Sequence, residues 1–131
     1  MISFLLSVNK VIKISVFLLY LSCIMALSLL PPRDLPQVQL FEGVDKLVHF
    51  LMYLPLSALL CWNLRAELSF RRVYGAVLLS VLWGMFMEIM QFNMHLGRSF
   101  SWFDELANLL GAVTGALLYK LVVSSAMRSK S

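Results

Sequence analysis

Four long apolar runs constrain this chain more than any other feature of its sequence. They cover residues 14–30, 47–62, 73–92 and 106–123. A helix needs about 20 apolar residues to cross the hydrocarbon core of a bilayer, with about 17 as the lower limit. Three runs meet this length, and the second meets it if the residues before it extend the helix.

The chain has 131 residues, of which 60% are hydrophobic and 14% charged. One aqueous core of this size cannot bury that much apolar surface. We therefore predict an all-α polytopic membrane protein with a bundle of four transmembrane helices.

The predicted helices cover residues 14–30, 45–64, 73–92 and 104–123, within one domain over 14–123. Of the 11 Lys and Arg residues, eight lie in segments on the side of both termini and three lie on the other side. The positive-inside rule then predicts an N-in/C-in protein of the cytoplasmic (inner) membrane, with a cytoplasmic N-terminus (1–13) and a frayed cytoplasmic tail (124–131). The alternative for the first run is a cleaved signal peptide, but its apolar core is longer than is typical for one.

The unusual polar residues gather at one level of this bundle, the extracytoplasmic ends of the second, third and fourth helices. In chain order they are Asp45, Lys46, His49, Glu88, Gln91, Arg98, Asp104 and Asn108.

Helical spacing predicts which of these residues share a face. Asp45 and His49 are four residues apart, and Gly84 lies one turn before Glu88. The fourth helix carries a stripe that is polar at its start and glycine below, where small residues allow close helix approach. We expect this stripe to face the bundle, and the neighbouring Glu105 to be solvated. The stripe consists of Asp104, Asn108, Gly111 and Gly115.

These residue types suggest acid–base chemistry, and the candidate catalytic residues are His49, Glu88 and Asp45. His49 can transfer protons near neutral pH, Glu88 can act as acid or base, and Asp45 can orient His49. Arg98 can hold a phosphate or carboxylate with two hydrogen bonds. The remaining candidates for substrate binding are Lys46, Gln91, Asp104 and Asn108. No spacing matches a metal site, and no cofactor is expected.

Structural roles compete with each assignment. Asp45 and Asp104 can cap their helices, and Lys46 can extend to the lipid head groups. Glu88 is the hardest to explain structurally, because a carboxylate inside an apolar span costs at least about 2.5–3.5 kcal/mol unless it is paired or hydrated. A structural ion pair with Lys46, Arg98 or His49 is the alternative for Glu88.

Together these residues resemble the VanZ-like family over about residues 44–120. The motifs that carry the resemblance are DKLVH at Asp45–His49, EIMQ at Glu88–Gln91 and RSFSWFDELANLLG at Arg98–Gly111. The resemblance implies a small bacterial membrane protein of the cell envelope. The family takes its name from a member associated with low-level teicoplanin resistance. It supports the site residues more than it supplies a reaction, and resistance is not carried over to this chain.

Three functions fit these observations. The first is an envelope protein whose extracytoplasmic pocket binds or modifies a lipid-linked or cell-wall-related substrate, with effects on glycopeptide susceptibility as one outcome. The second is a structural or partner-binding membrane subunit, and the third is a small transporter component, against which the apolar inner halves of the helices argue. Membrane lipids are expected partners and nucleic acid is not. The sequence leaves open both the oligomeric state and whether the protein is an enzyme.

Overall fold

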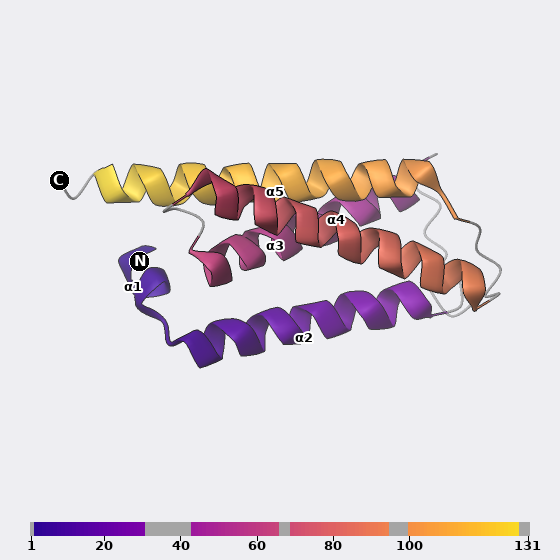
Figure 1. Cartoon of the computed structure of the whole chain (residues 1–131), viewed down its shortest axis with the longest axis horizontal. Helices are drawn as coiled ribbons and strands as arrows, with labels where there is room; N and C mark the ends of the chain where they lie inside the picture. The colour runs from indigo at the N-terminus through magenta and orange to yellow at the C-terminus, as the bar shows by residue number, and fades with distance from the viewer. Residues whose placement is uncertain (1, 31–42, 66–68, 95–99, 129–131) are drawn as a thin grey trace.

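The computed structural model describes residues 2–30, 43–65, 69–94 and 100–128, and the regular structure in these ranges is helical. A short helix, α1 (Ile2–Ser7), precedes four long helices, α2 (Lys10–Leu29), α3 (Val44–Leu64), α4 (Phe70–Asn93) and α5 (Trp102–Arg128). All four long helices have the length and apolar composition to cross a membrane. Successive long helices run in opposite directions along the bundle (Figure 1). The predicted fold class, an all-helical chain with four apolar spans, is confirmed.

Two of the long helices begin earlier than their apolar runs suggest, because a polar residue caps each of them. The side chain of Asn9 accepts a hydrogen bond from the Val11 amide at 2.9 Å, so α2 begins at Lys10 rather than at residue 14. The Ser69 hydroxyl accepts from the Arg71 amide at 3.3 Å, so α4 begins at Phe70 rather than at residue 73. Helix α5 continues to Arg128, so the expectation of a frayed tail was wrong for residues 124–128. The sequence interpretation also missed α1.

Helix α3 lies at the centre of the packing, in contact with α2, α4 and α5. Its closest neighbour is α5, because two glycines remove side-chain bulk from the interface. A Cβ atom on Gly111 would overlap the Phe50 carbonyl oxygen, and one on Gly115 would overlap the Leu54 carbonyl oxygen. The two backbones therefore meet directly, as small residues allow in membrane bundles.

Two small apolar clusters fill the interior, while much of the outer surface is apolar. One cluster joins α2 to α3 through buried Ile24, Tyr53 and Leu56. The other joins α3, α4 and α5 through four buried residues. Because large apolar side chains are exposed along all four long helices, the solvent for this surface is lipid. The second cluster consists of Cys61, Val73, Ala76 and Ala116.

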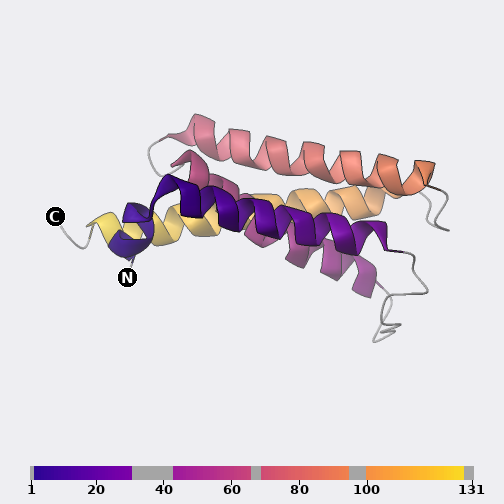
Figure 2. The same ribbon diagram turned by 90° about the horizontal axis from the view of Figure 1, so that it is seen from below.

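The bundle has two distinct ends (Figures 1 and 2). The terminal end holds α1, the start of α2 and the last turns of α5. The polar end holds the last turns of α2 and α4 and the first turns of α3 and α5, and there the predicted polar residues lie.

Candidate functional site

Three helices bring six polar residues together at the polar end. They lie in the first two turns of α3, the last two turns of α4 and the first two turns of α5. We call this group the polar cluster. It consists of Lys46, His49, Glu88, Asp104, Glu105 and Asn108.

A chain of hydrogen bonds fixes the central residues of the polar cluster. The Asn108 amide nitrogen donates to Glu105 Oε2 at 3.0 Å, which turns the amide oxygen of Asn108 toward His49. That oxygen lies 3.0 Å from His49 Nδ1. With the amide held this way, Nδ1 is the donor, and Nε2 of a neutral His49 carries the free lone pair. His49 Nε2 faces the Asp104 carboxylate, with Oδ2 at 3.9 Å.

The start of α5 connects Asp104 to Glu88. Ser101 caps the helix, because its hydroxyl accepts from the Asp104 amide at 3.3 Å. The Ser101 amide donates to Glu88 Oε2 at 3.3 Å, and Glu88 is 2% exposed. Lys46 Nζ lies 3.6 Å from Asp104 Oδ1, a distance that allows ion pairing without a hydrogen bond. Sequence analysis did not single out Ser101, whose place before Asp104 fits a helix N-cap.

Two predicted site residues have other neighbours. The Asp45 side chain is 57% exposed and pairs with Lys46 at 2.8 Å, so the partner that orients His49 is Asn108 and not Asp45. Gln91 is buried, and its side-chain amide donates to the Ser28 carbonyl of α2 at 2.7 Å. Gln91 therefore ties the first span to the bundle. Arg98 lies outside the described residues.

Glu105 corrects the sequence interpretation. It was expected to be solvated, but it is 6% exposed and bonded to Asn108. The reason is that α5 packs against two helices, so residues beside the predicted stripe are covered as well. On α4, Gly84 provides the space: a Cβ there would lie 2.7 Å from Asn108 Nδ2 and 2.9 Å from Glu105 Oε2. A second stripe on α5, with small alanines below Glu105 and Asn108, is the sequence signal that could have indicated the burial of Glu105. It consists of Glu105, Asn108, Ala112 and Ala116, spaced i, i+3, i+7 and i+11.

The model of the VanZ/LLP1 family matches residues 15–123 of the chain. The chain belongs to the VanZ/LLP1 family. The matched range contains the whole polar cluster and most of each long helix, so this VanZ/LLP1 chain is a multi-pass membrane protein. Comparisons with curated proteins and with solved structures gave no match.

Hydrogen-bond acceptors dominate the described part of this VanZ/LLP1 site. The polar cluster contains three carboxyl groups, those of Glu88, Asp104 and Glu105, and one ammonium group, that of Lys46. Asp104 Oδ1 and Glu105 Oε1 are buried without a hydrogen-bond partner among the described residues. An unpaired buried polar atom costs about 1–3 kcal/mol. The arrangement therefore favours a ligand that supplies hydrogen-bond donors or positive charge.

The same groups could hold a metal ion. His49, Glu88 and Asp104 each offer one ligand atom, and these atoms lie within 4.8 Å of one another. Imidazole and carboxylate are donors that suit divalent transition metals, although the nearby Lys46 ammonium opposes a cation electrostatically. Sequence spacing gave no sign of this set because its members come from three helices. The expectation that no metal is bound remains a prediction.

Proposed function

We propose that this VanZ/LLP1 protein binds the head group of a lipid-linked or cell-wall-related substrate at the polar cluster. The observation that supports this most directly is the pair of buried oxygens, Asp104 Oδ1 and Glu105 Oε1, that accept no hydrogen bond from the described residues. Sugar hydroxyls and peptide amides of cell-wall precursors are donors of the kind that these oxygens lack. The cluster also lies at the ends of the spans, at the depth where a lipid head group would sit.

Proton transfer is the chemistry that this site offers to a bound substrate. Asn108 holds the His49 ring so that Nε2 can accept a proton from a ligand beside Asp104. Glu88 lies in the same group within 4.8 Å and provides a second acid–base residue. Modification of the head group, as well as binding, is therefore compatible with the residues present.

Complementation of a strain that lacks the gene tests this proposal. Lipid and wall-precursor profiles would be compared after expression of the natural chain, His49→Ala, Glu88→Ala and the matched control Asp45→Ala. Asp45 is an acidic residue of the same end, but its side chain is exposed. We expect the natural chain and Asp45→Ala to restore the parental profile, and the other two variants to fail at equal membrane abundance. Restoration by His49→Ala and Glu88→Ala would overturn the proposal.

A structural role of the polar cluster is the second candidate, favoured by the contact between His49 and Asn108, which joins α3 to α5. Thermal unfolding of purified Glu88→Gln and Asp104→Asn separates the two functions. A large fall in melting temperature for both variants supports a cluster that locks the bundle. Unchanged melting temperatures, together with failed complementation, support a ligand site.

A further inference from the structure

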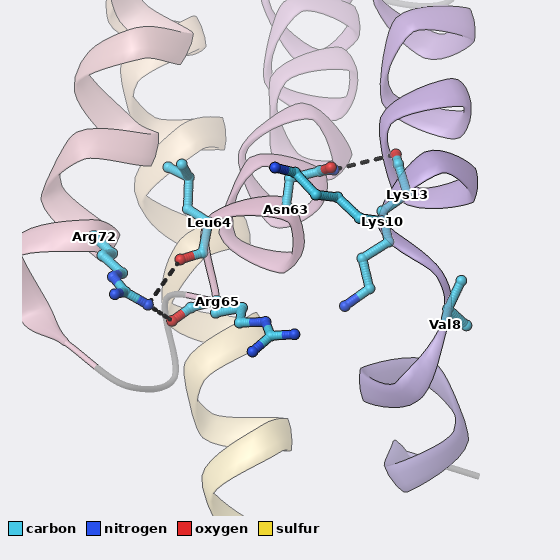
Figure 3. A pocket seen from close by; sticks show the side chains of 7 residues that line it. All are labelled: Val8, Lys10, Lys13, Asn63, Leu64, Arg65 and Arg72. Carbon is cyan, nitrogen blue, oxygen red and sulfur yellow. Dashed lines mark hydrogen bonds between the residues drawn. The ribbon is translucent and has the colours of Figure 1, made fainter.

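A pocket of about 480 Å³ opens at the terminal end (Figure 3). The polar cluster lies at the opposite end of the bundle. Its walls come from the segment before α2, the first turn of α2, the last residues of α3 and the first turn of α4. Figure 3 shows these side chains around one opening between the three helices. The residues that line it are Val8, Lys10, Lys13, Asn63, Leu64, Arg65 and Arg72.

The charge of this pocket is strongly one-sided. Among the described residues that line it, four are Lys or Arg and none is Asp or Glu. Within the described ranges of the chain, no ion pair involves any of these four cations. Among the described residues, nothing neutralises this positive potential, which favours an anion in the pocket.

Backbone groups position the cations. Arg65 ends α3 in the left-handed conformation, with φ 51°, and its amide donates to the Cys61 carbonyl. The Arg72 guanidinium of α4 donates to the carbonyls of Leu64 and Arg65, each at 3.3 Å. These bonds, drawn in Figure 3, join the start of α4 to the end of α3 and hold the Arg72 guanidinium against the backbone of Arg65.

Lys13 is the most informative residue of the pocket, because it is 4% exposed. Its ammonium group donates to the Leu6 carbonyl at 3.2 Å and lies 5.0 Å from the centroid of the Trp62 ring. A carbonyl and an aromatic face stabilise a cation, but neither neutralises its charge. A buried charge is costly without an opposite charge nearby, so an anion in the pocket would lower the cost of burying Lys13.

An apolar groove of about 430 Å³ begins beside the pocket, between α3 and α5. Trp62 lines the groove and lies against Lys13, which lines the pocket, so these two side chains form a shared wall. The residues that line the groove include Leu54 and Gly115, and α1 contributes Leu5 and Leu6. An amphiphile with an anionic head and an acyl chain suits this combination better than a free ion does.

We propose that the terminal-end pocket binds the phosphate head group of an anionic phospholipid. The cations lie where α2 and α4 begin and α3 ends, which is the level of the head groups for helices that span the bilayer. Basic pockets between transmembrane helices bind anionic head groups in this way. The site is separate from the polar cluster and needs neither its ligand nor its chemistry.

Thermal unfolding of the full-length protein in detergent micelles tests this proposal. The added probes are phosphatidylglycerol, phosphatidylcholine with the same acyl chains, and inorganic phosphate. The pocket variant is Lys10→Gln with Arg65→Gln, which removes two exposed charges. The matched control is Arg71→Gln with Lys120→Gln, which removes two charges near the same end from residues outside the pocket. If the double pocket variant does not fold, Lys10→Gln and Arg65→Gln are measured singly.

We expect phosphatidylglycerol to raise the melting temperature of the natural chain and of the control, and this shift to fall by at least half in the pocket variant. Phosphatidylcholine and inorganic phosphate should give little shift. Equal shifts with the two lipids would overturn the proposal, and so would equal losses in the pocket and control variants, which indicate diffuse surface charge. A full shift with inorganic phosphate would also overturn it, because the ligand would then be a free anion.

Discussion

At the scale of single residues, Asn108 organises the candidate site. It is 1% exposed, and its one amide group contacts two side chains, His49 at 3.0 Å and Glu105 at 3.0 Å. The donor end serves Glu105 and the acceptor end serves His49, so the direction of the amide sets the tautomer of the imidazole. An isosteric change that removes the donor should therefore affect both neighbours.

The substitution Asn108→Asp should destabilise the protein, because it places a carboxylate oxygen against Glu105 Oε2 where a hydrogen bond was. We expect a loss of at least about 1–3 kcal/mol, the usual cost of leaving a buried polar group unpaired. Adding Glu105→Gln should recover much of this loss, since the new amide can donate to the introduced carboxylate. Unfolding of the single and double variants in mixed micelles measures both effects. A double variant less stable than Asn108→Asp alone would contradict this account of the pair.

Residue spacing alone could predict part of this site but not its internal partners. The positions of His49, Glu88 and Asp104 at one level follow from helix lengths and alternating direction, which the apolar runs determine. The choice between Asp45 and Asn108 as the partner of His49 depends on how α3 and α5 pack. That packing joins residues 59 positions apart and is not encoded in the spacing along either helix.

At the scale of elements, the contact between α3 and α5 holds the site together. Gly111 and Gly115 lie directly below the polar residues of α5, against the carbonyl groups of Phe50 and Leu54. His49 immediately precedes Phe50, so the distance between the two backbones also sets the distance between His49 and Asn108. The position of each glycine could be predicted from the stripe. The ends of the helices could be predicted less accurately, because a capping residue such as Asn9 starts its helix before the apolar run begins.

Alanine at Gly111 should separate these two helices. The added methyl group meets backbone rather than a flexible side chain, so we expect a loss of about 1–3 kcal/mol from overpacking. The matched control is Gly75→Ala in α4, where a Cβ meets nothing within 4 Å. Alanine is the better helix former by about 1 kcal/mol, so the control should be neutral or slightly stabilised. Chemical unfolding in mixed micelles measures both changes, and equal effects at the two glycines would rule out close α3–α5 packing as the cause.

At the scale of the whole molecule, the two ends of the bundle differ in charge and chemistry. The polar end gathers carboxylates, an amide and an imidazole, whereas the terminal end gathers Lys and Arg around a pocket. Lys13 illustrates what sequence reasoning could not supply. It counts as one more cytoplasmic charge in the positive-inside rule, yet the fold of α1 over Trp62 buries it. The orientation of these ends in the membrane decides which leaflet each site meets.

The positive-inside rule predicts that the terminal end faces the cytoplasm. In a Cys23→Ala, Cys61→Ala background, a single cysteine replacing Met94 marks the polar end, and one replacing Ser125 marks the terminal end; both positions are exposed. A membrane-impermeant maleimide added to spheroplasts should label the Met94→Cys variant at once and the Ser125→Cys variant after detergent is added. Labelling of Ser125→Cys in sealed spheroplasts would contradict this prediction and indicate the opposite orientation. The polar cluster would then meet cytoplasmic-leaflet substrates, and the basic pocket would face the extracytoplasmic leaflet.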